Sequence, residues 1–130
     1  MPLLYAETTS KIIGCFYTVY NTLGFGFLEK VYENAFKHKL EKSGLNVIQQ
    51  KAIDVFYDGV IVGQYFADIV VENKIILELK SIENISQIHE AQLHNYLKAT
   101  SMKVGYLMNF GRKAEYKRII LNQCQSDKSV

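Results

Sequence analysis

Residues 65–81, YFADIVVENKIILELKS, contain two runs of alternating apolar residues on either side of a short polar break. Apolar residues at a period of two, interrupted by polar residues, predict a β-hairpin. Three charged residues occupy strand positions in this hairpin: Asp68, Glu78 and Lys80. Successive side chains of a strand point to opposite faces. Glu78 and Lys80 therefore share one face with Ile76, and the other face carries Ile75, Leu77 and Leu79.

The length of the hairpin loop decides whether the two acidic residues meet. A three-residue loop, 72–74, pairs Val71 with Ile75 and puts Asp68 opposite Glu78. Like charges directly across a ladder destabilise it, and a divalent cation, which binds carboxylate oxygens, would compensate. We expect this odd loop or an equivalent bulge, because an even loop would put the two acids on opposite faces. The competing interpretation is a solvated outer face of a two-layer sheet.

The composition limits the protein class without naming a function. The chain has 130 residues, 48% of them hydrophobic, which predicts one domain over residues 1–130 with a real core. A net charge of +2 is too small to argue for nucleic acid by itself. Cys15 and Cys124 have no metal-binding spacing, so we expect free thiols. No apolar run reaches the ~18 residues of a membrane span, and we expect a soluble cytoplasmic protein without membrane contact.

The order of the expected elements predicts the fold class. Apolar spacing and turn residues predict helices at 7–23, 27–42 and 87–100 and strands at 47–57, 60–71, 74–80 and 103–110, with an edge strand at 116–121 left open. The crossover through the third helix makes the two strands that it joins parallel. This predicts an α/β (α+β) fold, a mixed sheet flanked by helices.

Two helices carry polar residues that could serve a site. Glu29 lies in the first turn of the second helix, where a carboxylate also suits the helix dipole. His89, Gln92 and Tyr96 share one face of the third helix. A surface face with a half-buried tyrosine explains these three residues equally well.

Basic residues surround Tyr116 near the C-terminus: Arg112, Lys113, Lys117 and Arg118. A cluster of cations next to an aromatic ring fits contact with a phosphate backbone. It fits solubility at an exposed sheet edge as well.

The motifs resemble those of a known superfamily. Asp68 followed at this distance by the string 78–80, ELK, resembles the PD-(D/E)XK nucleases, whose core is a restriction-endonuclease-like αβββαβ unit. The string 26–32, GFLEKVY, looks like the signature of the GxxExxY proteins inside that superfamily, and 92–96, QLHNY, is similar to the QxxxY element of RecB-like exonucleases. Ala67 stands where many members carry proline. No cysteines exist for the iron–sulfur cluster of some relatives. The helix at 7–23 would be an addition to the core.

The resemblance implies a metal centre. Asp68, Glu78 and the main-chain carbonyl of Leu79 would hold one or two Mg²⁺ or Mn²⁺ ions, and Glu29 would add a carboxylate. The metal would activate water for attack on a phosphodiester. Lys80 would orient that water or stabilise the developing negative charge.

The resemblance also implies substrate contacts. Gln92 and Tyr96 would position the phosphate or a flanking nucleotide, with His89 on the same rim. Arg112 and Lys113 would hold the nucleic-acid backbone without reading its sequence. The remaining residues considered match no signature position, and we expect them on the surface: Glu33, His38, Asp54, Asp58, Glu72 and His94.

The expected function is a metal-dependent nuclease acting on DNA, with RNA and exonuclease or endonuclease action left open. The alternatives are a non-catalytic module of the same fold that binds nucleic acid or a partner, and a hydrolase of a smaller phosphate ester. A homodimer or a helicase-type partner is expected, since so short a chain has little structure with which to clamp a duplex.

Overall fold

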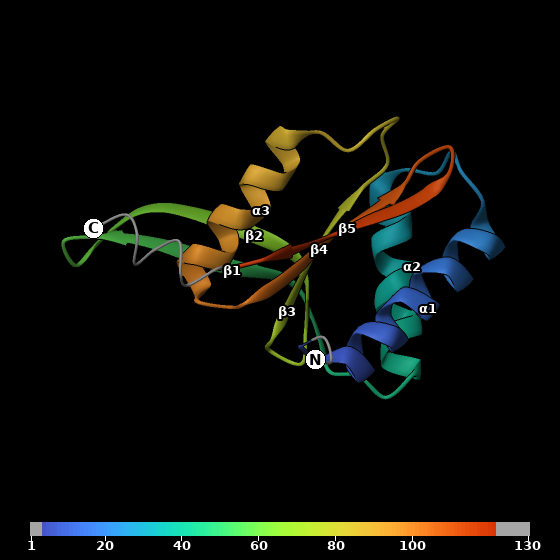
Figure 1. Ribbon diagram of the computed structural model, residues 1–130, viewed down its shortest axis with the longest axis horizontal. Coiled ribbons are helices and arrows are strands. Elements are labelled where there is room, and N and C mark those ends of the chain that lie inside the picture. Colours follow the sequence, from blue (N-terminus) through green and yellow to red (C-terminus); the bar gives the residue numbers. More distant parts are fainter. Residues whose placement is uncertain (1–3, 122–130) are drawn as a thin grey trace.

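The computed structural model describes residues 4–121 (Figure 1). The elements follow the predicted order and are, in sequence: α1 (Ala6–Leu23), α2 (Glu29–Lys42), β1 (Val47–Tyr57), β2 (Val60–Val71), β3 (Ile75–Lys80), α3 (Gln87–Thr100), β4 (Val104–Phe110) and β5 (Ala114–Ile120). The edge strand left open by the sequence is therefore present. None of the helices within residues 4–121 is long and apolar enough to cross a membrane.

The five strands form one mixed sheet in the order β1-β2-β3-β4-β5. All neighbours are antiparallel except β3 and β4, which are parallel and joined through α3. The predicted α+β class, a mixed sheet flanked by helices, is confirmed.

The helices cover the two faces of the sheet unequally. α1 and α2 pack on one face through the larger core cluster, which includes Phe16, Phe36 and Leu77. α3 packs on the other face through a smaller cluster that includes Leu93 and Leu97. The β1–β2 hairpin reaches past α3 at the left of Figure 1, where neither cluster extends.

The hairpin register follows the prediction. Val71 pairs with Ile75 and Ile69 pairs with Leu77, which gives a three-residue loop. Glu72 and Asn73 both take positive φ angles, 54° and 53°, and the loop is closed by a hydrogen bond from the Lys74 N–H to the Val71 carbonyl. The predicted odd loop is confirmed.

The second helix starts later than predicted. It begins at Glu29, because Gly26 takes a φ of 112° and Leu28 has an extended conformation, neither of which continues a helix. Cys15 is buried and unpaired, as expected. Cys124 lies outside the described residues.

Candidate active site

The Asp68 and Glu78 carboxylates meet where the regular β2–β3 ladder ends at Ile69 and Leu77. The main-chain N–H of Asp68 donates to Oε1 of Glu78 at 3.0 Å. In return, the main-chain N–H of Leu79 donates to Oδ2 of Asp68 at 2.9 Å. Each carboxylate thus accepts a hydrogen bond from the opposite strand, and the two acids come together as the odd loop predicts.

Burial disfavours the ionised form of both acids. Burial, reinforced by the charge of Asp68, raises the pKa of Glu78 from 4.5 to about 8. Burial also raises the pKa of Asp68, although the N–H of Leu79 and the amide of Gln50 oppose that change. The Lys80 ammonium lowers both pKa values, but by less than burial raises them. Lys80 therefore lies close enough to act on both carboxylates.

Glu29 approaches the same pair from the first turn of α2. Partial burial, and after it the charge of Asp68, raises the pKa of Glu29, which places a third carboxylate within electrostatic reach. The loop before α2 is held by Tyr32, whose hydroxyl donates to the Gly24 carbonyl and accepts the N–H of Phe27. The glycine and the tyrosine of the string 26–32 thus shape the loop that presents Glu29.

Glu33 corrects one of the expectations above. Its side chain was expected on the surface, yet it is only 3% exposed. Four hydrogen bonds from Lys30 and Gln50 reach its two carboxylate oxygens, and Gln49 adds a fifth at 2.7 Å. A glutamate one turn after Glu29 is buried because polar side chains from β1 surround it.

Gln50 joins this network to Asp68 and was not singled out from the sequence. Its side-chain amide donates to Oδ1 of Asp68 at 3.2 Å as well as to Glu33. Gln50 has a φ of 53°, which is rare for a residue other than glycine inside a strand. The β1–β2 pairing skips this position, between Gln49 with Ile69 and Lys51 with Ala67. The polar pair Gln49-Gln50 in an otherwise alternating strand was the available signal.

The third helix brings two of its three predicted residues to the site. Burial, with the charge of Glu78 next in size, raises the pKa of Tyr96, so its hydroxyl lies near the acid pair. Gln92 donates to that hydroxyl at 3.0 Å. His89 instead forms the N-terminal cap of α3, where its Nδ1 accepts the N–H of Ser86.

The basic residues near the C-terminus do not form one cluster, contrary to expectation. Lys117 lies opposite Leu107 and pairs with Glu90 on the α3 side, while Arg118 lies opposite Tyr106 and donates to its hydroxyl. Neighbouring residues of a strand face opposite sides, which separates the two cations. Arg112 and Lys113 precede β5 and are exposed, with Arg112 3.4 Å from Glu83.

Residues 6–119 match the family model of the PD-(D/E)XK nuclease superfamily. The chain belongs to this superfamily. It also matches a solved structure, "Crystal structure of SSO0001", with 18% identity and a TM-score of 0.56 over 95% of this chain. That likeness concerns the fold, and the match spans 60% of the other chain. No curated protein matches the sequence.

PD-(D/E)XK nucleases generally use divalent metals such as Mg²⁺, and the chemistry of the acid pair suits such an ion. Burial raises the pKa of both carboxyl groups, and the charge of Asp68 raises that of Glu78 further, so a cation would stabilise the ionised form of the pair. Residues 4–121 nevertheless hold no group of three or more acidic, histidine or cysteine side chains close enough to enclose a metal ion. The described site therefore offers a pair of carboxylates with Glu29 at a greater distance.

Proposed function

We propose that the protein is a metal-dependent nuclease that hydrolyses phosphodiester bonds of DNA. The observation that supports this most is the pair of carboxylates beside Lys80, in which Glu78 accepts the N–H of Asp68 and Asp68 accepts the N–H of Leu79, in a chain that belongs to a superfamily of nucleases. The proposal includes the GxxExxY subfamily and the RecB-like QxxxY element, and with that element an exonuclease.

Asp68, Glu78, the Leu79 carbonyl and Glu29 would hold the Mg²⁺ or Mn²⁺ ion. When bound, the ion would polarise the phosphate and lower the pKa of a water molecule. Glu29 would have to move closer than its present position, and the turn that carries it is the first of α2. The exposed first turn of a helix is a place where such an adjustment costs little.

Lys80 is suited to a catalytic role because its ammonium is available. The ion pairs found among residues 4–121 do not include it, although it acts on the pKa of all three carboxylates. An ammonium in a partly buried site can orient the attacking water or stabilise the charge that develops on the phosphate. Tyr96 and Gln92, already hydrogen-bonded to each other, would position the phosphate from the α3 side.

Calorimetric titration with Mn²⁺ and a cleavage assay on linear and single-stranded DNA test this proposal together. Wild type should bind the metal and cut DNA, and Asp68→Ala should do neither. Asp54→Ala is the matched control, because Asp54 also lies on a strand and bonds Gln64 at a distance from the acid pair. Absence of Mn²⁺ binding by wild type would rule the nuclease out.

A non-catalytic nucleic-acid-binding module is the second candidate. The absence of a closed three-ligand group among residues 4–121 favours it. A module would bind DNA in a salt-dependent way that Glu78→Gln leaves unchanged, and would cut nothing in any metal. The same two assays separate it from the nuclease.

The far end of the β1–β2 hairpin supports assembly with a partner. Large apolar side chains are exposed there: Phe56, Tyr57, Val60, Ile61, Val62, Tyr65 and Phe66. Exposed apolar patches mark interaction sites, and β1 is an edge strand of the sheet formed by residues 4–121. We include a homodimer through this hairpin in the proposal, with a helicase-type partner as the alternative. Light scattering on wild type and Ile61→Ser tests the dimer, which the variant should dissociate.

A further inference from the structure

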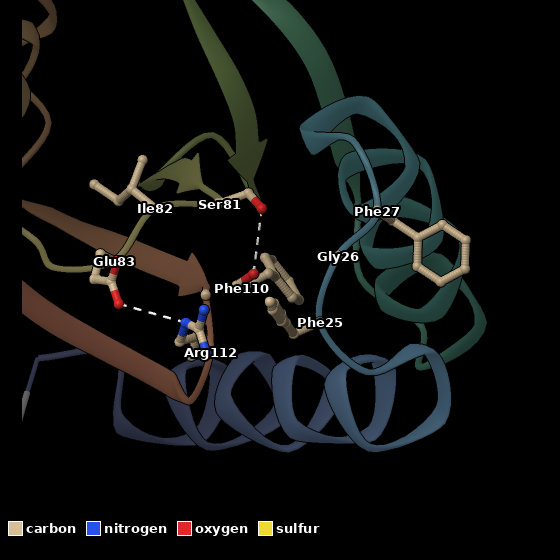
Figure 2. A pocket seen from close by; sticks show the side chains of 9 residues that line it. Phe25, Gly26, Phe27, Ser81, Ile82, Glu83, Phe110 and Arg112 are labelled. Atoms are coloured by element: carbon tan, nitrogen blue, oxygen red, sulfur yellow. Dashed lines mark hydrogen bonds and ion pairs between the residues drawn. The ribbon is translucent and has the colours of Figure 1, made fainter.

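A cavity of about 410 Å³ lies at the ends of β3 and β4. Three segments line it: residues 25–27 before α2, residues 81–83 after β3 and residues 110–112, which begin with the last residue of β4. Figure 2 shows Phe25 and Phe110 pointing toward each other, while the Phe27 ring lies on the far side of the loop. The volume lies within the range of about 300–1,000 Å³ that is usual for small-ligand sites.

Hydrogen bonds and close packing hold together the segments that line this cavity. The buried carboxamide of Asn109 accepts the Ile82 N–H at 3.0 Å and donates to the Ile82 carbonyl at 2.9 Å. Gly111 lies so close that a Cβ atom there would overlap the Ile82 carbonyl oxygen. The segments after β3 and β4 are thereby joined, and Phe110 stacks on Tyr32 with a centroid distance of 4.6 Å. The cavity is a preformed site.

One rim of the cavity combines an aromatic ring with a cation. Phe25 is about half exposed, and the Arg112 guanidinium lies 5.3 Å from the centroid of its ring. Arg112 also pairs with Glu83 at 3.4 Å, but both side chains are about three-quarters exposed (Figure 2). Ion pairs between exposed side chains contribute little, so an incoming phosphate can replace Glu83.

The cavity lining includes close sequence neighbours of two proposed catalytic residues. Ser81, in one wall, directly follows Lys80. Phe27, in the opposite wall, lies two residues before Glu29. Because consecutive Cα atoms lie about 3.8 Å apart, Ser81 and Phe27 are close to Lys80 and Glu29, and a strand with its scissile phosphate at the acid pair can extend a neighbouring nucleotide toward the cavity.

We propose that this cavity is a subsite for one unpaired nucleotide next to the scissile phosphate. The base stacks on Phe25 and its phosphate binds Arg112, since stacking on aromatic rings and charge-assisted contact to phosphate are how single strands are held. A base can reach a cavity only when it is unpaired, so the substrate class is a single strand or a frayed end. The placement of the nucleotide next to the scissile phosphate rests on the proposed nuclease function. The choice of an unpaired nucleotide as the ligand rests on the residues of the cavity.

Binding of a labelled single-stranded 12-mer to the Glu78→Gln protein, measured by fluorescence anisotropy, tests the subsite without cleavage. Phe25→Ala added to this protein should weaken binding about tenfold, the size expected for one lost base stack. Arg112→Ala should weaken it and reduce its salt dependence. Tyr17→Ala is the matched control, because Tyr17 is an exposed aromatic residue of α1 that does not line the cavity, and it should change nothing. A blunt duplex should respond less to Phe25→Ala than the single strand does.

The outcomes separate the subsite from the nuclease function. If the single strand does not bind, or if Phe25→Ala and Tyr17→Ala bind it equally, the subsite is overturned, whatever the cleavage assay on wild type gives. If wild type cuts nothing but Phe25→Ala still weakens binding, the nuclease fails and a single-strand binding site remains. Melting temperatures of the variants check that each is folded.

Discussion

The two ends of the β2–β3 ladder differ sharply in what they do. Residues 69–71 of β2 pair regularly with residues 75–77 of β3, and all six are buried and apolar. One position further, the regular pairing gives way to hydrogen bonds that main-chain N–H groups donate to the Asp68 and Glu78 carboxylates. The apolar end stabilises the fold, whereas the acidic end carries two groups that burial penalises. Stability and chemistry are thus divided along one hairpin.

The largest effect is expected at the acidic end. Asp68→Asn should lower metal-dependent cleavage about a thousandfold, which corresponds to about 4 kcal/mol of transition-state stabilisation. The carboxamide oxygen can still accept the Leu79 N–H and only the bond from Gln50 is lost, so the free energy of unfolding at pH 7 should fall by no more than about 1 kcal/mol. Single-turnover cleavage and urea unfolding measure the two quantities. Equal loss of both would contradict the division between the ends.

The apolar end should show the opposite response. Leu77→Ala removes a fully buried side chain from the larger core cluster and should cost about 3 kcal/mol of unfolding free energy. Ile120→Ala, at a half-exposed position of β5, is the control and should cost much less. Urea unfolding of both variants gives the comparison.

The pH dependence of stability sharpens the comparison further. Because the pKa of Glu78 is raised to about 8, the folded state binds a proton that the unfolded state releases above pH 4.5. Without divalent cations, stability should therefore fall as the pH rises from about 4.5 to 8. Glu78→Gln should remove much of this slope and be about 2 kcal/mol more stable than wild type at pH 9. Thermal melts from pH 4 to 9 would refute this if the two slopes were equal.

The smallest effect is expected from the residue that bridges the acid pair to Glu33. Gln50→Asn keeps a side chain that tolerates positive φ but is too short to reach both carboxylates. Cleavage should fall about tenfold, about 1.4 kcal/mol, while the Mn²⁺ affinity shifts in the same direction. Gln49→Asn, which disturbs Glu33 without touching Asp68, should have less effect.

Sequence reasoning predicted those features that depend on neighbours along the chain. The apolar alternation in residues 65–81 gave the register, and the register placed Asp68 beside Glu78. The separation of Lys117 and Arg118 could also have been predicted, since adjacent strand residues face opposite sides. The prediction of one basic cluster was wrong because it considered only how close these residues are in the sequence.

The missed features depend on segments that only the folded chain brings together. Glu33 resembles a solvated helix residue until β1 supplies Gln49 and Gln50 around it. Gln50 has a positive φ, and no glycine at this position indicates that conformation in the sequence. The cavity exists because Asn109 and Gly111 bring two distant loops into contact, and no local pattern encodes that contact.

Removing the hydroxyl oxygen of Tyr32 would separate the local stability of the loop before α2 from the stability of the whole protein. Its ring belongs to the core through Phe110, and its hydroxyl bonds the main chain of Gly24 and Phe27 in the loop before α2. Tyr32→Phe would keep the packing and free the loop. The amide of Phe27 would then exchange with deuterated solvent faster, while the slowest-exchanging amides of β3 and β4 would keep their rates. The rate at which the loop beside the site opens is therefore set independently of the free energy of global unfolding.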